Sequence, residues 1–315
     1  MTFGTVYALW LRDHVLHNCV AGEYRNLCSI YRVHLKEPLG EVKLTELKRS
    51  RLMALLRQKE AAQLSRQTVL HIRNAISRPI AWAITNLDLD LEHPFSTFYF
   101  RYKGQRQRSI RYLEKEVVQR FFRACEEQNS PYTTYYYILY YLGLRPSEGL
   151  GLQRKDIGPE FLQIRRAVTN DGPKQTKCAT AIRDLPICAG LRKILDDYLA
   201  TLPPGQEWLF AKSIDDVPKL TRVTNNFRRL KARTAIWDSK RRRRGEKRKC
   251  LKEAVEFKLY DFRHTFATNL VRKDVPIAKI SQLMGHSDIS VTMAYYVERL
   301  KEDLKELGDK LEPEQ

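Results

Sequence analysis

The chain has 315 residues, 43% of them hydrophobic, which is more than a single core usually takes and enough for two domains. Its 56 lysines and arginines outnumber its 37 acidic residues and give a formal charge of +19. A polyanionic partner is therefore expected, with nucleic acid as the leading candidate, although ribosomal and membrane-surface proteins share such a charge.

Several classes of protein are disfavoured by what the sequence lacks. The six cysteines are scattered, with no C-x-x-C pair and no histidine at zinc-finger spacing, so neither a zinc site nor a disulfide framework is predicted. No apolar run approaches the roughly 18 residues of a membrane span, and the first residues lack the basic-then-apolar order of a signal peptide. We therefore expect the cysteines to be reduced thiols and the protein to be located in the cytoplasm. In a bacterium this would be the cytoplasm or the nucleoid.

Residues 1–100 show only helical patterns. The first apolar face is formed by Phe3, Val6, Leu9, Trp10 and Val15, which are separated by steps of three to five residues except for the adjacent pair Leu9 and Trp10. Further helices are expected near residues 22–36, 44–60 and 65–86. Residues 101–111 are basic and have no apolar period, which is typical of a linker between domains.

From Leu113 the pattern changes to mixed α and β, mainly helical. An aromatic-rich helix is expected over residues 132–142, ended by Gly143. Strands are expected at residues 161–168 and 180–187, joined by a turn that contains residues 170–173, and the two strands would form a small antiparallel sheet. Residues 240–249 are almost purely basic and predict a loop.

Three segments carry residues suited to chemistry, and the first surrounds Arg145. A helix ends at Gly143 and Pro146 can open the next, so Arg145 is expected in a rigid corner between two helices. Glu148, three residues further on, can reach back to orient the guanidinium. A surface arginine with a local ion pair is the alternative interpretation.

The second and third segments lie near the end of the chain. In the second, an apolar stripe is formed by Leu259, Phe262, Phe266 and Leu270. Tyr260 and Arg263, at i and i+3, then share a neighbouring helical face. In the third, a helix over residues 276–284 ends at Gly285, His286 follows, and a short helix over residues 287–297 carries Tyr295 and Tyr296.

Together these segments resemble the catalytic domain of the tyrosine recombinases, the phage-integrase family. That family has an arginine in a G-x-R-x-x-E corner, a hairpin lysine, an H-x-x-R helix, and L-G-H followed nine residues later by a tyrosine. The matching residues here are Arg145 with Glu148, Arg263, His286 and Tyr295. The family's hairpin spacing is matched by Thr176, Lys177, Arg183 and Pro186, so Lys177 is preferred to Lys174 as the hairpin lysine.

The resemblance implies a role for each matched position. The implied catalytic residues are Arg145, Lys177, Tyr260, Arg263, His286 and Tyr295, supported by Glu148. Phosphate contacts outside the catalytic centre are expected from Lys174, Arg241, Arg242, Arg243 and Arg244. Tyr260 stands where the family usually has histidine; it can donate a hydrogen bond to phosphate but is a weak base near neutral pH. Tyr296 is the second candidate for the nucleophile.

A site-specific recombinase that cleaves and rejoins DNA through a covalent 3′-phosphotyrosine, for integration and excision of a mobile element, is the function that the resemblance implies. A type IB topoisomerase-like enzyme and a DNA-binding protein that has lost catalysis are the alternatives. No carboxylate cluster of the kind that a two-metal nuclease needs is evident in the sequence, so we expect no metal and no cofactor.

The resemblance also implies domains and partners. Residues 1–100 would be a helical core-binding domain, residues 101–111 a linker, residues 112–296 the catalytic domain and residues 297–315 a C-terminal helix for protomer contact. That helix has a leucine stripe, formed by Leu300, Leu304, Leu307 and Leu311, and a mostly acidic opposite face. It would pack on its own catalytic domain or, by analogy with the family, on a neighbouring protomer. The partners would be double-stranded DNA with inverted-repeat core sites, three further copies in a tetramer, and an accessory excision factor.

Many integrases carry an arm-binding domain before the core-binding domain, whereas here Met1 lies at the start of the core-binding pattern. Either the protein lacks that domain or the chain is truncated.

Overall fold

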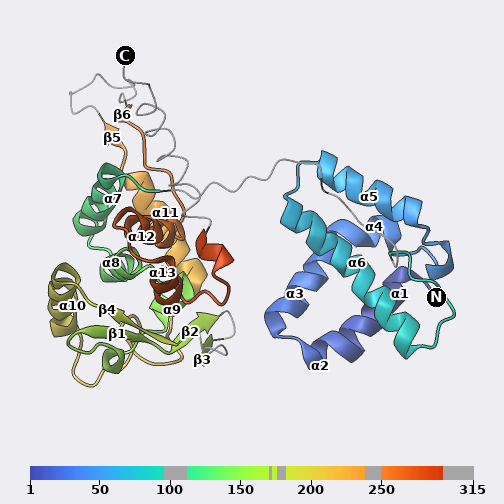
Figure 1. Cartoon of the computed structure of the whole chain (residues 1–315), viewed down its shortest axis with the longest axis horizontal. Helices are drawn as coiled ribbons and strands as arrows, with labels where there is room; N and C mark the ends of the chain where they lie inside the picture. Colours follow the sequence, from blue (N-terminus) through green and yellow to red (C-terminus); the bar gives the residue numbers. More distant parts are fainter. Residues whose placement is uncertain (96–101, 103–111, 170–171, 176–181, 238–249, 294–315) are drawn as a thin grey trace, which may run out of the picture. The chain divides into compact units, whose positions relative to one another are not determined.

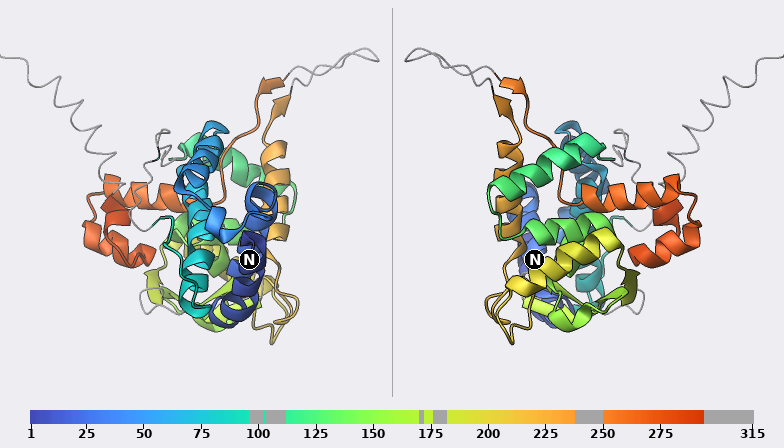
Figure 2. Two further views of the ribbon diagram at one scale, coloured as in Figure 1. Left: turned by 90° about the vertical axis from the view of Figure 1, so that its right-hand side faces the viewer. Right: turned by 90° about the vertical axis from the view of Figure 1, so that its left-hand side faces the viewer.

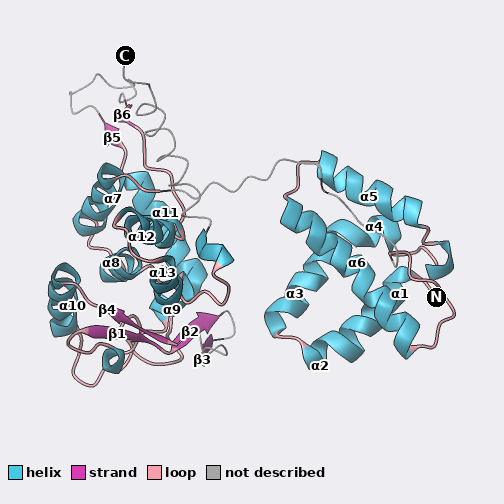
Figure 3. Cartoon of the chain, in the orientation of Figure 1, coloured by secondary structure: helices cyan, strands magenta, loops and turns pink. Residues whose placement is uncertain are grey.

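A computed structural model describes residues 1–95, 102, 112–169, 172–175, 182–237 and 250–293. The chain divides into two compact units, Met1–Arg108 and Ser109–Gln315. A helical first domain and a mainly helical second domain with small antiparallel sheets were predicted from the sequence, and both are confirmed (Figures 1 and 3). No helix in the described ranges is long and apolar enough to cross a membrane.

The described part of the first unit contains helices and no strands. Its elements are α1 (Phe3–Trp10), a π-helical turn (Leu11–Val15), α2 (Leu16–Asn18), α3 (Ala21–Ile30), a second π-helical turn (Tyr31–Leu35), α4 (Lys36–Leu39), a 3₁₀ turn (Leu44–Glu46), α5 (Arg49–Ala61) and α6 (Arg66–Asn86). The long α6 packs against α1, α3 and α5. One expected core position is wrong: Leu9 is only half-buried, whereas Tyr7 is fully buried and its hydroxyl donates to the carbonyl of Leu27 at 3.1 Å.

The second unit is built around an aromatic core. Its helices are α7 (Lys115–Glu127), α8 (Thr133–Leu142), α9 (Pro146–Leu150), a 3₁₀ turn (Arg154–Asp156), α10 (Ala189–Thr201), α11 (Leu220–Arg233), α12 (Asp261–Arg272) and α13 (Ile277–Met284). The ring of Phe121 on α7 lies within 5.7 Å, centroid to centroid, of the rings of Tyr136, Phe227, Phe257 and Phe262. This core joins α7, α8, α11 and α12, so the ends of α8 and α12 are held at fixed positions.

The sheet differs from the expected arrangement of two strands. The structure has β1 (Phe161–Ile164), β2 (Arg166–Thr169), β3 (Gly172–Gln175) and β4 (Arg183–Pro186), in which β1 pairs with β4 and β2 with β3, all antiparallel. The prediction of one strand over 161–168 is therefore wrong, because the chain changes pairing partner at Arg165. Gly172 and Pro173 belong to β3 rather than to the turn.

Two contacts position these strands against the helices. A Cβ atom on Gly151 would lie 2.8 Å from the carbonyl oxygen of Arg166, so the lack of a side chain lets β2 pass directly beside the end of α9. The strand β4 contacts α13. A third pair, β5 (Ile236–Trp237) and β6 (Cys250–Lys252), extends away from the helices of this unit (Figure 2).

Candidate active site

Arg145 lies in the corner between α8 and α9, as the sequence predicted. The backbone turns at Gly143 with φ of 62°, and a Cβ atom there would lie 2.3 Å from the ring of Phe266, so only glycine lets α8 end against α12. Arg145 caps α9: its backbone N–H donates to Glu148 at 2.9 Å, and its guanidinium donates to the same carboxylate at 2.8 Å. A third of the Arg145 side chain remains exposed (33%), so part of the guanidinium can meet a ligand.

Glu148 is shared by a second arginine that the sequence analysis used only as a spacing marker. The guanidinium of Arg183 on β4 donates to both carboxylate oxygens of Glu148, at 2.8 and 3.2 Å, and Nε donates to the carbonyl of Leu283 at 2.7 Å. The Arg183 side chain is only 4% exposed. A signal was present in the strand pattern, because Arg183 and Leu185 lie on the same inward face of β4, and a buried guanidinium needs hydrogen-bond acceptors around it.

Glu148 remains ionised in this environment. Burial raises the pKa of its carboxyl, but the hydrogen bonds and charges of Arg183 and Arg145 outweigh that rise and leave the pKa below its usual range. One buried carboxylate thus holds two guanidinium groups, and a positive charge is left over at the corner.

Arg263 is the most deeply buried arginine of the site, with 1% of the residue exposed. Its guanidinium donates to the carbonyl of Gly143 at 2.7 Å and to the carbonyl of Met284. Burial, followed by the repulsion of Arg145, lowers the pKa of Arg263 to about 10, so it is still a cation at neutral pH. Its Nε is buried and has no hydrogen-bond acceptor within the described parts of the chain.

The C-terminal end of α13 connects these side chains. A helix leaves its last carbonyls without helical partners, and its C-terminus attracts cations. Here the carbonyls of Leu283, Met284 and Gly285 accept hydrogen bonds from three different arginines, which are Arg183, Arg263 and Arg145 in that order. The left-handed conformation of Gly285, with φ of 62°, ends the helix so that these carbonyls face the site.

His286 follows directly, and its ring is held by a residue that the sequence analysis missed. Its Nδ1 lies 2.8 Å from the hydroxyl oxygen of Thr292, which is completely buried. Burial and the charges of Arg263, Arg145 and Arg183 lower the pKa of His286 to about 4. The imidazole is therefore neutral at pH 7, and it shares one hydrogen bond between Nδ1 and the Thr292 hydroxyl, in which either group can donate. The neutral ring carries its proton on Nε2 when the hydroxyl is the donor.

Tyr260 lies at the edge of the site rather than within it. It is the residue before α12, 40% of it is exposed, and its ring contacts that of His264 at 5.1 Å. The expected stripe on α12 is partly wrong, because Phe266 and Leu270 are only half-buried, whereas Arg263 and Thr265 are buried. The reason is that α12 packs between α8 and α13, so both sides of the helix are covered.

Several expected site residues lie outside the described residues: Lys177, Tyr295, Tyr296, Arg241, Arg242, Arg243, Arg244 and the stretch 297–315. The backbone of Lys174 lies in β3, opposite Ala167 of β2, but its side chain is not among those that the structure describes. The chain is helical from Ser290 to Met293, where the description stops just before Tyr295. The residues that the structure brings together are Arg145, Glu148, Arg263 and His286, with Tyr260 beside them.

The order of these residues along the chain agrees with a sequence profile. The profile of the phage integrase family matches residues 111–302, which is more than half of the chain and contains every residue of the cluster. The chain belongs to the phage integrase family.

Curated members of this family match the same region. A tyrosine recombinase XerC from Rhodospirillum centenum is 29% identical over 161 residues, covering 50% of this chain and 40% of the relative. A tyrosine recombinase from Thermosipho africanus is 28% identical over 189 residues, covering 58% of this chain and 56% of the relative. The chain thus spans about half the length of the curated relatives it matches.

Solved integrase structures share the fold over nearly the whole chain. The Tn1549 transposon integrase, in complex with a circular intermediate DNA, superposes with a TM-score of 0.75 at 17% identity and covers 94% of this chain and 95% of its own. The lambda integrase tetramer bound to a Holliday junction gives a TM-score of 0.67 at 16% identity, covering 91% of this chain and 78% of the lambda chain. Both units of the present chain therefore have the integrase fold.

Proposed function

We propose that this phage integrase family member is a site-specific DNA recombinase that breaks and rejoins DNA through a covalent 3′-phosphotyrosine, for integration and excision of a mobile element. The observation that carries the proposal is the cluster of Arg145, Arg263 and His286 around the end of α13. It holds more positive charge than the one carboxylate of Glu148 can balance, which suits a site for phosphate.

The buried arrangement explains how charge would be stabilised. Attack on a phosphodiester builds negative charge on the non-bridging oxygens, and fixed guanidinium groups bind such oxygens with paired hydrogen bonds. Arg145 and Arg263 are held by backbone carbonyls before any ligand arrives, so they need little reorganisation during the reaction. His286 would add an uncharged donor at Nε2, with the Thr292 hydroxyl donating to Nδ1.

The remaining roles follow the family pattern. Tyr295 would attack the phosphorus, Lys177 would protonate the departing 5′ oxygen, and Tyr260 would donate a hydrogen bond to phosphate at the rim. A tyrosine hydroxyl has a pKa of about 10, so Tyr295 needs the surrounding cations to favour its phenolate. The phosphotyrosyl ester keeps the energy of the broken bond, and the free 5′ hydroxyl can reseal the strand without ATP. No metal or cofactor has a role in this scheme.

The wider assembly is also part of the proposal. Residues 1–100 would bind the core site, residues 101–111 would link the two domains, and residues 112–296 would cleave. Lys174 and the run Arg241–Arg244 would contact phosphates. Four protomers would assemble on inverted-repeat DNA, with the helix of residues 297–315 docked on a neighbouring protomer and an accessory factor directing excision. The integrase fold across both units supports this arrangement.

The first experiment tests the nucleophile. Tyr295→Phe should abolish the covalent DNA complex that survives denaturation, while duplex binding stays within about twofold, because one hydroxyl is lost from a large basic interface. The substrate is duplex DNA taken from the sequence that flanks the gene and chosen for short inverted repeats, and Tyr296→Phe is the matched control. Mapping of the phosphotyrosyl peptide to Tyr296 would contradict the assignment. Relaxation of supercoiled DNA without strand exchange would favour a type IB topoisomerase instead.

A further inference from the structure

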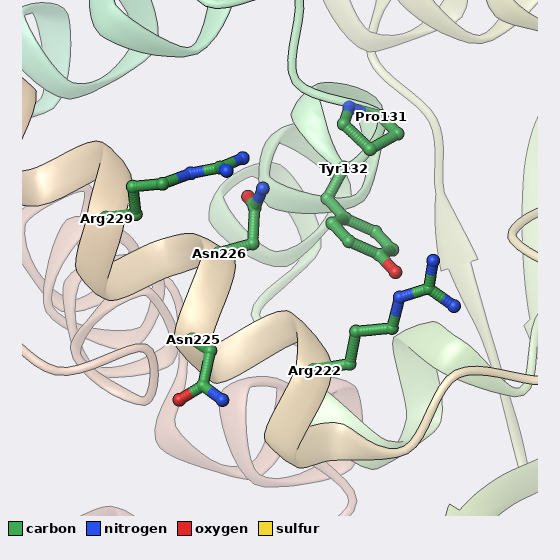
Figure 4. A pocket seen from close by; sticks show the side chains of 6 residues that line it. All are labelled: Pro131, Tyr132, Arg222, Asn225, Asn226 and Arg229. Atoms are coloured by element: carbon green, nitrogen blue, oxygen red, sulfur yellow. The ribbon is translucent and has the colours of Figure 1, made fainter.

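A separate pocket lies at the other end of α8, ten residues before Gly143. It has a volume of about 380 Å³ and is lined by Pro131, Tyr132, Arg222, Asn225, Asn226 and Arg229. Four of these six residues come from α11. Figure 4 shows Arg222 and Arg229 extending from α11 on either side of Asn226, with the ring of Tyr132 opposite them. The catalytic residues are not part of this lining.

Asn226 has a fixed orientation at the base of the pocket. Its Oδ1 accepts a hydrogen bond from the hydroxyl of Tyr136 at 2.9 Å and another from the hydroxyl of Ser130 at 3.0 Å. Both donors are buried. The single proton of the Tyr136 hydroxyl also faces the carbonyl of Val223, at 3.2 Å. In the orientation that the structure gives the amide, its oxygen accepts from Ser130 and Tyr136 and the two N–H donors of Nδ2 are left for another acceptor.

The charged groups that line this pocket are both arginines, and its other polar groups, the hydroxyl of Tyr132 and the amides of Asn225 and Asn226, can each donate hydrogen bonds. Arg222 and Arg229 form no hydrogen bond or ion pair with any residue in the described ranges, and no acidic residue lines the pocket. Burial raises the pKa of Tyr132, so its hydroxyl stays protonated. An adjoining pocket of about 290 Å³ shares Pro131, Tyr132 and Arg222 with it and is also lined by Asp216.

The helix that carries the pocket is itself basic. Its 14 residues, Leu220–Arg233, include Arg222, Arg228, Arg229, Lys231 and Arg233 and no acidic residue. A ligand that accepts hydrogen bonds from all sides and carries negative charge fits such a surface, and a phosphate group has both properties.

We propose that the pocket between α8 and α11 binds a phosphate group through Arg222, Arg229 and the amide of Asn226. The group comes from a DNA backbone or from a small phosphate compound. Only the DNA source rests on the proposed function. With DNA, the pocket adds a phosphate contact outside the catalytic centre; with a small compound, it is an independent ligand site on the same domain.

The test compares two double variants of the full chain that remove equal charge from α11. Arg222→Gln/Arg229→Gln changes the pocket, whereas Arg228→Gln/Arg233→Gln changes exposed arginines of α11 outside its lining. A third variant, Asn226→Asp, keeps the size of the side chain and an oxygen for Tyr136 and Ser130, but replaces the donor of the pocket with an acceptor.

Two measurements identify the source of the phosphate. The first is the slope of log K against log salt for duplex DNA, which falls by about 0.9 for each phosphate contact that is lost. If DNA is the source, the slope falls by about that amount in the pocket variants and stays unchanged in the Arg228/Arg233 control. The second is thermal unfolding without DNA in inorganic phosphate or tripolyphosphate, against chloride at equal ionic strength. If a small compound is the source, the wild-type midpoint rises by about 4 °C at ten times the dissociation constant, and the pocket variants lose that rise.

The proposal would be overturned if all variants had the wild-type salt slope for DNA binding and the same shift of the unfolding midpoint in phosphate as the wild type. It would also be overturned if the salt slope fell equally in the pocket variant and in the Arg228/Arg233 control. Covalent complex formation by Tyr295 at saturating protein is followed in parallel. Its absence in the wild-type chain would contradict the proposed function but leave the result with small phosphates standing.

Discussion

Two groups of arginines in the second unit have opposite surroundings. Arg183 and Arg263 are almost fully buried, and backbone carbonyls or Glu148 accept their hydrogen bonds. Arg222 and Arg229 are exposed on α11 and have no such acceptors among the described residues. The same side chain is thus a rigid, preorganised part of a site in one place and a solvated charge in the other, and the difference lies in the backbone that surrounds it.

The comparison also shows what holds the buried arginine side chains in fixed positions. The carbonyls at the end of α13 accept from three arginines on three other elements, so the position of one helix end sets the whole cluster. Charges on α11 act mainly through salt-screened attraction. Substitutions in the cluster should therefore alter folding and chemistry, whereas those of Arg222 and Arg229 on α11 should alter the salt dependence of binding.

The largest effect is expected from removing the shared carboxylate. Glu148→Gln leaves Arg183 and Arg145 without their counter-ion in a buried place, which should lower the free energy of unfolding by about 3 to 5 kcal/mol. Urea denaturation measures this loss. The control is Asp196→Asn, whose exposed ion pair with Arg192 should contribute at most about 1 kcal/mol. Similar losses in the two variants would mean that burial does not distinguish these pairs.

A rate effect of about 10² to 10³ is expected for Arg263→Lys, because lysine cannot reproduce the two directed bonds to Gly143 and Met284 and still face a phosphate. Single-turnover cleavage at saturating protein is the measurement. Arg233→Lys, the same substitution at an exposed arginine of α11 outside the pocket, should cleave at nearly the wild-type rate. Normal cleavage by the Arg263 variant would exclude it from the catalytic centre.

A smaller effect is expected at Thr292. Thr292→Val removes the hydroxyl that sets the ring of His286, and loss of one such hydrogen bond should slow cleavage by about tenfold. Thr292→Ser keeps the hydroxyl and should restore most of the rate, which a purely structural role of the methyl group would not predict. Thermal unfolding of both variants separates a loss of stability from a loss of rate.

The smallest effect is expected in how the free energy of unfolding depends on pH through His286. The pKa of His286 is lowered to about 4 in the folded chain, whereas a free histidine has a pKa of about 6.5. Between these values the unfolded chain binds a proton that the folded chain does not, so the stability contributed by this group decreases as pH falls from 6.5 to 4 and is constant above. The difference in unfolding free energy between wild type and His286→Gln, measured from pH 4 to 8, should follow that course. A difference that stays constant below pH 6.5 would show that the ring is not neutral in the folded state.

The sequence alone determined the features that depend on neighbouring residues. Gly143 and Gly285 end helices because only residues tolerant of positive φ suit those positions, and Glu148 orients Arg145 from three residues away within the first turn of α9. The helical character of the first unit followed from apolar spacing in the same way. The motif around Arg145 and His286 could be recognised in the sequence because its corner and its helix end are local structures.

Only the tertiary structure decided which distant groups meet. Arg183 reaches Glu148 across 35 residues, and Arg145 reaches the carbonyl of Gly285 across 140. The change of strand partner at Arg165 and the pocket between α8 and α11 likewise depend on how elements pack rather than on their own patterns. A carbonyl at a helix end has no side-chain identity, so no sequence pattern could indicate that the end of α13 would accept hydrogen bonds from three arginines; packing alone brought them together.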